Sequence, residues 1–390
     1  MHYQFNFYSA ILLIFFSQGI IFSYLLFRRS ASQNRYADKL LGIFIVLCAL
    51  YILPWMLGFA GWYFVQPYRD IMFYLPLQQL LLLGPLMYFY TCSQLDVSFK
   101  IVRKNFIHFI PAAMYLAYTF IVWVVDKIIL GRYYFYADGH DKDLDSWYQL
   151  LGLFSMSIYG FMSMKKYLGY RRTIFNSVSF ADTITFAWVK KYLFAFLAMQ
   201  AIRIIFFVLY PEWGNFSAKG WYYLSFSILF YYIAIHALLN NVKSIAPVKL
   251  TEEDEPLPLR KGQEENQPAD NLQFESWKLR ISSFIEQHRS YENPELTLAD
   301  LARDLQTNPT TLSKVINKAY GMNFNDFINN LRIEAFKQQL NLKVYEKHTL
   351  LAIAFDCGFN SKTTFNRAFK KNTSLTPKSY VAETVEQNNI

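Results

Sequence analysis

Apolar residues dominate the first 240 positions of the chain, in runs about as long as a membrane-spanning helix. Each run approaches the ~20 residues that a helix needs to cross ~30 Å of hydrocarbon. The seven runs lie near residues 7–27, 40–64, 71–91, 106–125, 147–166, 191–210 and 221–240. The pattern predicts that residues 1–240 form a seven-span transmembrane bundle, because a soluble domain with seven such runs would lack polar surface.

Basic residues gather in alternate loops between these runs. The loops after the first, third and fifth runs hold 13 lysines and arginines, and the remaining loops hold five. Cytoplasmic loops of membrane proteins carry the excess of basic residues. The N-terminus is therefore expected outside, and an odd number of spans then places the C-terminus in the cytoplasm.

Few polar side chains interrupt the apolar runs. Four of them are expected at similar depth in the outer half: Gln78, Gln79, Gln200 and Arg203. A charged side chain at that depth is costly unless it is paired or hydrated, and no Asp or Glu lies mid-span to pair with Arg203. These residues are a candidate ligand or signal site. The alternative is hydrogen bonding between helices, with Arg203 extending toward the membrane surface.

The longest outer loop, residues 126–147, is acidic. Its aspartates are Asp138, Asp141, Asp143 and Asp145. The spacing is similar to that of a calcium loop, but Ser146 and Gly152 stand where such a loop requires glycine and glutamate. A solvated acidic loop is expected, and no metal site is predicted.

Beyond residue 240 the apolar runs stop. Residues 241–275 contain four prolines, carry 8 acidic and 4 basic residues, and are expected to form a flexible linker. Residues 276–390 are polar and have a net charge of +4, within a chain total of +9, which is compatible with a nucleic-acid partner. The three cysteines, Cys48, Cys92 and Cys357, lie far apart and are expected to pack in the interior rather than to form a disulfide or a zinc site.

Two similar patterns follow each other in residues 276–390. Each consists of a short apolar helix, a tight turn and a second helix with a basic polar face, over residues 298–320 and 350–371. A helix over residues 325–340 is expected between them. At ~24 Å it could hold two recognition helices near the ~34 Å spacing of successive major grooves. The pattern predicts two helix-turn-helix motifs in an all-α domain.

The second helix of each motif has an apolar and a polar face. Leu312, Val315 and Ile316 follow helical spacing and should face the core. The opposite faces carry side chains that reach base edges and phosphates, although an ordinary solvated face is the alternative for either copy. The predicted DNA contacts are Thr310, Ser313, Lys314, Asn317, Lys362, Thr363, Asn366 and Arg367.

Residues 297–380 resemble the DNA-binding domain of the AraC/XylS family of transcription regulators. The resemblance rests on Leu301-Ala302, Leu312-Ser313-Lys314, Arg332 to Leu340, Ile353-Ala354, Gly358-Phe359, Ser361 through Phe365, Arg367, Phe369-Lys370-Lys371, Thr376-Pro377 and Tyr380. It implies base contacts at the predicted positions other than Asn317. Ser374 departs from the pattern, because glycine usually stands there.

A domain of this kind behind seven spans is similar to membrane-bound AraC-type regulators of Bacteroidetes-like bacteria. The resemblance implies a protein of the bacterial inner (cytoplasmic) membrane. Its expected partners are double-stranded promoter DNA, the lipid bilayer and an unknown signal ligand, with a homodimer as an open option. It implies no cofactor and no enzymatic activity.

Two alternatives stay open. The chain contains no phosphate-binding loop, nucleophile elbow, zinc-protease or dinucleotide-binding motif. A transporter or membrane receptor whose tail acts as a regulatory or protein-docking module would nevertheless fit the same pattern. A regulator whose DNA-binding domain is released by proteolysis in the linker would fit as well.

Overall fold

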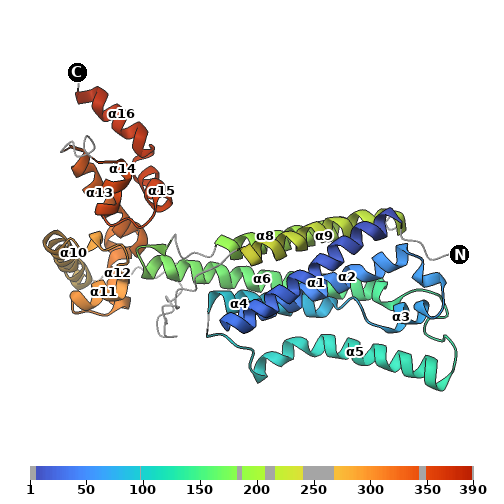
Figure 1. The fold of residues 1–390 in the computed structure, drawn as a ribbon. Coiled ribbons are helices and arrows are strands. Elements are labelled where there is room, and N and C mark those ends of the chain that lie inside the picture. Colours follow the sequence, from blue (N-terminus) through green and yellow to red (C-terminus); the bar gives the residue numbers. More distant parts are fainter. Residues whose placement is uncertain are drawn as a thin grey trace. The chain divides into compact units, whose positions relative to one another are not determined.

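A computed structural model describes residues 6–96, 98–181, 187–206, 216–239, 268–341 and 348–388 (Figure 1). It is 82% helical. Within the described ranges, strand-like pairing is limited to one isolated bridge, between Val178 and Thr297. The predicted all-α fold class is therefore confirmed.

The chain divides into two compact units. The N-terminal unit comprises Met1–Leu168 and Ala187–Pro247, and the C-terminal unit comprises Gly169–Phe186 and Val248–Ile390. The predicted domain boundary lies at residue 240. The C-terminal unit also includes a short segment from the apolar half, Gly169–Phe186.

The helices of the N-terminal unit follow the apolar runs. They are α1 (Phe7–Gln33), α2 (Tyr36–Phe59), α3 (Tyr68–Tyr74), α4 (Leu80–Leu95), α5 (Ile110–Trp123), α6 (Ser146–Ser177), α8 (Ala187–Ile204) and α9 (Phe216–Leu239). Short 3-10 helices lie at Trp62–Phe64, Arg103–Phe109 and Lys142–Leu144, and a π-helical turn at Val124–Ile129 continues α5. The run predicted over residues 71–91 is divided between α3 and α4, with Pro76 in the break.

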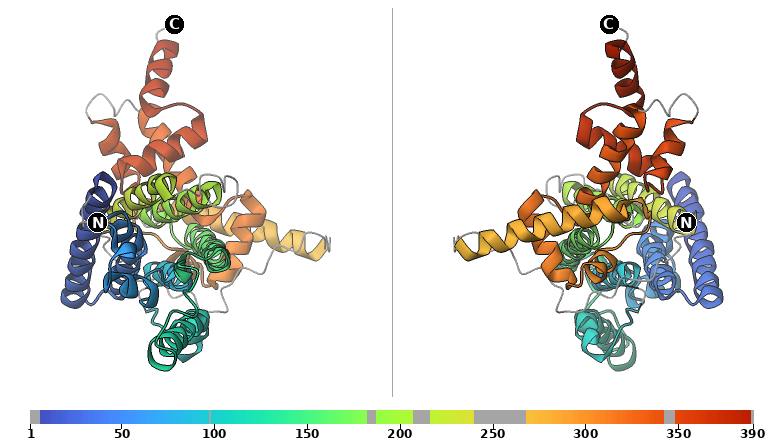
Figure 2. Two further views of the ribbon diagram at one scale, coloured as in Figure 1. Left: turned by 90° about the vertical axis from the view of Figure 1, so that its right-hand side faces the viewer. Right: turned by 90° about the vertical axis from the view of Figure 1, so that its left-hand side faces the viewer.

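Four helical stretches in the described residues are long and apolar enough to cross a membrane: Phe7–Gln33, Tyr36–Phe59, Arg103–Ile129 and Gly220–Leu239. The predicted spans outside these stretches stay predictions. α1 lies beside α2 and α9 (Figure 2). α2 is largely buried, whereas α1 and α5 expose many apolar side chains, among them Ile14, Ile21, Met114, Phe120 and Ile121.

The C-terminal unit contains the helices of both predicted motifs. They are α10 (Pro268–His288), α11 (Leu298–Asp304), α12 (Pro309–Tyr320), α13 (Phe324–Asn341), α14 (Leu350–Asp356), α15 (Lys362–Thr373) and α16 (Pro377–Asn388), with a 3-10 turn at Ser290–Glu292. α11 and α12 form the first helix-turn-helix, and α14 and α15 form the second. α13 covers the helix expected over residues 325–340 and exceeds it by one residue at each end.

α10 begins inside the segment predicted to be a flexible linker. Pro268 occupies its first position, where proline's missing amide is not needed. Trp277, Ile281, Phe284 and Ile285 pack on the first motif at helical spacing. This apolar stripe begins only after residue 275, so the sequence pattern predicts a later start for this helix than the structure shows. The rest of the predicted linker, residues 240–267, lies outside the described residues.

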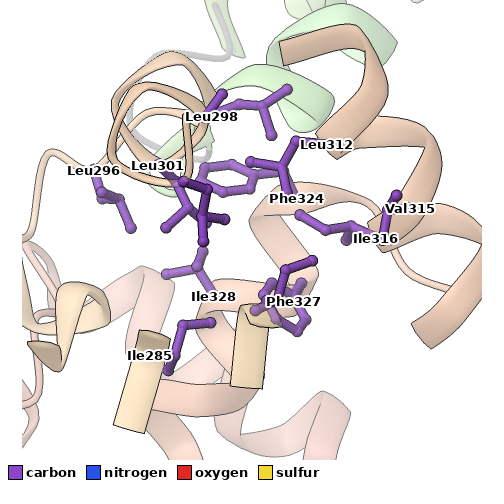
Figure 3. Packing of buried hydrophobic residues seen from close by; sticks show 13 residues of the cluster. Ile285, Leu296, Leu298, Leu301, Leu312, Val315, Ile316, Phe324, Phe327 and Ile328 are labelled. Atoms are coloured by element: carbon purple, nitrogen blue, oxygen red, sulfur yellow. The ribbon is translucent and has the colours of Figure 1, made fainter. Parts of the chain in front are cut away.

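α13 contributes to two separate hydrophobic cores. Phe324, Phe327 and Ile328 belong to the core of the first motif, together with side chains from α10, α11 and α12 (Figure 3). Further along the same helix, Phe336 and Leu340 belong to the core of the second motif. The two motifs are therefore built on opposite halves of one helix, and this helix fixes their separation and orientation.

Candidate nucleic-acid interface and a buried polar network

The first helix-turn-helix is closed by local hydrogen bonds that its sequence supplies. The Thr297 hydroxyl accepts from the Asp300 amide at 3.1 Å, and the Asp300 carboxylate accepts from the Thr297 amide at 3.3 Å. This capping box satisfies two amides that helix geometry leaves without partners. In the turn, Gln306 has a φ of 52°. Asn308 then caps α12 by accepting from the Thr311 amide at 2.7 Å.

The second helix-turn-helix repeats this plan. The Thr349 hydroxyl caps α14 by accepting from the Ala352 amide at 3.2 Å. Gly358 takes the place of Gln306 in the turn, with a φ of 93°. The Ser361 hydroxyl caps α15 by accepting from the Thr364 amide at 3.1 Å. Both recognition helices therefore begin at a defined residue, which sets the direction of every side chain that follows.

The described helices place the predicted DNA contacts away from the core. Leu312 and Ile316 of α12 and Phe365 and Phe369 of α15 are buried. Ser313 is half-buried. The exposed members of the predicted set are Thr310, Lys314, Asn317, Lys362, Thr363, Asn366 and Arg367. One continuous polar face on each recognition helix is the arrangement that a major-groove reader needs.

Polar contacts that the sequence did not predict fasten α15 to α13. The Lys371 ammonium lies 2.6 Å from the Asp326 carboxylate. Lys337 of α13 donates to the Asn372 side chain at 2.8 Å. These contacts lie at the end of α15 away from its cap, so the second recognition helix is held at both ends.

Arg332 of α13, which the sequence analysis named only as part of the family resemblance, has a structural role that was not predicted. Its side chain is buried and donates to the carbonyl oxygens of Tyr291 at 2.8 Å and Asn293 at 2.7 Å. Burial lowers the pKa of the Arg332 guanidinium to about 10. A signal was available, because Arg332 lies four residues from both Ile328 and Phe336 and so shares their buried face.

Two of the four residues of the candidate signal site meet in a buried network of the N-terminal unit. Arg203 donates to the backbone and side-chain oxygens of Gln149, both at 2.8 Å. Gln149 donates to the Gln78 side chain at 2.8 Å and to the Asp143 carbonyl at 2.6 Å. In the described part of the chain, the charge of Arg203 is thus met by amide oxygens. Gln149 had been overlooked because it stands at the start of an apolar run.

The other two residues of that set lie apart from these contacts. The Gln79 side chain donates to the Pro76 carbonyl at 2.7 Å, within the break between α3 and α4. The Gln200 side chain is buried, and neither its nitrogen nor its oxygen has a hydrogen-bond partner among the described residues. A buried amide without partners is costly, which makes Gln200 a feature that requires an explanation.

The prediction of a solvated acidic loop is wrong for two of its aspartates. Asp141 and Asp143 are buried, and they accept from the hydroxyls of Tyr63 and Tyr115, each at 2.5 Å. The backbone amide of Gln78 also donates to the Asp143 carboxylate at 3.0 Å. These donors, which come from distant parts of the chain, offset the cost of burial. Burial and repulsion by Asp143 raise the pKa of Asp141, and burial raises that of Asp143.

Comparison with known proteins bears on the C-terminal unit. Residues 301–383 match the family model of a helix-turn-helix domain. An HTH-type transcriptional regulator of Staphylococcus aureus is 34% identical over 101 residues, which cover 26% of this chain and 13% of that protein. An HTH-type transcriptional regulator of Escherichia coli is 34% identical over 88 residues, which cover 22% of this chain and 29% of that protein. No solved structure matches.

These matches describe one domain and not the whole chain. The similar segment spans 13% of the length of the Staphylococcus relatives. Within it, the chain carries a helix-turn-helix domain similar to those of these transcriptional regulators.

Proposed function

We propose that the chain is a membrane-anchored one-component transcription regulator, which binds promoter DNA through α12 and α15 and responds to a signal sensed by its N-terminal unit. One observation carries the DNA-binding part. Two capped helices present exposed polar and basic faces from a domain that matches a helix-turn-helix family. The resemblance to AraC/XylS regulators supports the use of both motifs by one chain.

The two recognition helices offer side chains for both kinds of DNA contact. Lys314 and Arg367 are exposed and stand at matching positions, five residues after the first residue of each helix. Arginine can donate two parallel hydrogen bonds to guanine, and asparagine, as at Asn366, can pair with adenine. The exposed lysines, Lys314 among them, suit phosphates, which supply affinity but no sequence information.

The test of DNA binding uses the full-length protein in lipid nanodiscs and selection from random DNA duplexes. We expect recovery of a defined operator, and loss of that preference in the double variant Lys314→Ala/Arg367→Ala. Lys378→Ala, which removes an exposed lysine of α16, is the matched control and should keep the preference. Selection of no sequence by the unaltered protein would refute the proposal.

Membrane anchoring rests on the four long apolar helices and on the apolar side chains exposed by α1 and α5. The loop charges favour an external N-terminus and a cytoplasmic C-terminus in a bacterial inner membrane. Reporter fusions at residue 390 and in the loop of residues 126–147 test this topology. Activity of a cytoplasmic reporter in the loop, or of an external reporter at residue 390, would contradict it.

For the signal site, we favour the surroundings of Gln78, Gln79, Gln200 and Arg203. Two observations support this choice: Arg203 is met by amide oxygens, and Gln200 lacks partners among the described residues. Arg203→Gln should alter the response of the regulated promoter to growth conditions. Arg132→Gln, which changes an exposed arginine, should not. If the promoter responds to growth conditions in the Arg203→Gln variant as it does with Arg132→Gln and with the unaltered protein, this site is excluded.

A further inference from the structure

The last turns of α6 belong to the unit that contains the DNA-binding helices. α6 is one helix from Ser146 to Ser177, and the C-terminal unit takes over the chain at Gly169. We call residues 169–181 the α6 tail. The tail continues a helix that begins in the N-terminal unit, but the tail itself belongs to the C-terminal unit.

The end of the α6 tail binds the C-terminal unit through its backbone. Val178 pairs with Thr297 in an antiparallel bridge, and the Ser179 amide donates to the Leu296 carbonyl at 3.1 Å. Val178, Ser179 and Ala181 are almost completely buried. This backbone pairing and burial fix residues 178–181 against the segment that leads into α11.

Two buried side chains of α13 complete the docking site. Asn325 donates to the Ser179 carbonyl at 2.8 Å, and Arg332 donates to the Ser179 hydroxyl at 3.1 Å. The acceptors recorded around Arg332 are neutral oxygens, and Ser179 supplies one of them. If the tail left, Asn325 and Arg332 would each lose a partner, and a buried polar group without a partner is costly. The site is therefore built to hold a backbone segment.

The docked tail also reaches the second recognition helix. The guanidinium carbon of Arg367 lies 5.8 Å from the centre of the Phe175 ring, within the range of a cation–π contact. Arg171 of the tail lies over the same ring at 5.4 Å. Arg367 is a proposed base contact. The Phe175 ring therefore lies against the guanidinium that the proposed base contact requires, so a duplex seated on α15 would have to share Arg367 with the tail or displace the tail from it.

We propose that residues 291–297 and the first half of α13 form a docking site for the α6 tail, and that the docked tail competes with DNA for Arg367. The proposal rests on the DNA-binding function proposed above. It gives the signal a direct route, because any change of α6 that withdraws Ser179 from Arg332 also withdraws Phe175 from Arg367. The route does not require the residues 240–267.

A disulfide between Val178→Cys and Thr297→Cys tests the proposal in the full-length protein. Residues opposite each other in an antiparallel pair lie ~4.5–5.5 Å apart at Cα, within the ~4.4–6.8 Å that a disulfide spans. The native thiols Cys48, Cys92 and Cys357 are buried, and each single-cysteine variant controls for oxidation and for the lost Thr297 cap. The protein is placed in nanodiscs of phosphatidylethanolamine and phosphatidylglycerol.

The measured quantity is the affinity for the operator that the unaltered protein selects from random duplexes. The oxidised double-cysteine protein should bind about tenfold more weakly than the same protein after reduction, which is the scale of one lost bidentate base contact. The single-cysteine variants should show no such difference. Equal or tighter binding in the oxidised form would overturn the proposal.

Phe175→Ala provides a second measurement that leaves the backbone docking in place. It should tighten operator binding about threefold, a scale set by the loss of one cation–π contact, and should have no effect when Arg367 is already alanine. Hydrogen exchange at residues 178–181 should stay slow in this variant. Suppose that the unaltered protein selects an operator. If the oxidised double-cysteine protein and the Phe175→Ala variant then bind that operator as tightly as the unaltered protein does, the docking proposal fails and the DNA-binding proposal stands. If no operator is selected, DNA binding fails with it.

Discussion

The two helix-turn-helix motifs share a plan down to single positions. Each has a seven-residue first helix with a threonine cap and a twelve-residue recognition helix. Three matching pairs of recognition-helix residues show the correspondence: Leu312 and Phe365 are buried, Ile316 and Phe369 are buried, and Lys314 and Arg367 are exposed. The same local rules have therefore produced the same scaffold twice.

The motifs differ in the turn and in what surrounds it. The turn of the second motif, residues 357–361, is one residue longer than residues 305–308 of the first. At Gly358 an added Cβ would lie 2.3 Å from the Tyr291 carbonyl oxygen, whereas Gln306 already carries a side chain. In addition, Phe175 of the α6 tail contacts Arg367. Similar scaffolds can thus be placed under different constraints by their neighbours, and substitutions at matched positions measure the difference.

The largest effect is expected at the matched turn positions. Gly358→Ala should destabilise the second motif by about 3 kcal/mol or more, because the new methyl group meets backbone atoms and φ is 93°. Gln306→Ala should change the stability of the first motif by less than about 1 kcal/mol. Hydrogen exchange of α14 and α15 in the full-length protein, compared with α11 and α12, reports both values. Unchanged protection in Gly358→Ala would show that the turn can open to admit a side chain.

The next effect concerns DNA. Arg367→Ala should weaken operator binding by ~1–3 kcal/mol and relax the preference at one base position. Lys314→Ala should cost less and affect all sequences similarly, if its ammonium contacts a phosphate. Titration of a set of single-base operator variants at constant salt separates the two. A uniform loss for Arg367→Ala would mean that it, too, contacts only the backbone of the duplex.

A smaller difference is expected at the two threonine caps. Thr297→Ala should destabilise its motif by ~1–2 kcal/mol, because the Thr297 hydroxyl both accepts from the Asp300 amide and donates to the Asp300 carboxylate at 2.6 Å. Thr349→Ala removes a cap alone and should cost ~0.5–1 kcal/mol. Amide exchange in the first turns of α11 and α14 provides the measurement. If the two variants lost the same protection, the hydrogen bond from the Thr297 hydroxyl to the Asp300 carboxylate would contribute nothing beyond the cap.

The smallest effect lies at the ends of the recognition helices. Both Gly321 and Ser374 have a φ of 65°, a conformation that glycine adopts at little cost. Ser374→Gly should therefore stabilise the second motif by ~0.5–1 kcal/mol, and Gly321→Ser should destabilise the first by a similar amount. Amide hydrogen exchange in the last turns of α12 and α15 measures both changes in stability. A loss of stability in Ser374→Gly would show that the serine side chain supplies a contact that outweighs the backbone strain.

Most of the DNA-binding scaffold could be read before the fold was known. The bounds of α12 are written in residues with local roles: Asn308 is its cap, Pro309 takes its first position and Gly321 follows its last turn. Such signals involve residues a few positions apart. The start of α10 was misjudged, since its first eight residues, 268–275, precede the apolar stripe that packs on the core.

The sequence by itself determined where the two recognition helices begin and end, which of their faces are apolar, and that the pattern occurs twice, because hydrogen bonds within a helix and helical periodicity operate over a few residues. Only the tertiary structure decided that Asp143 is buried against Gln78 and Tyr115, that Arg332 lies in a core, and that the α6 tail docks beside it. Those outcomes depend on donors and acceptors more than 25 residues apart in the chain meeting out of water, and no local pattern specifies which of them will meet.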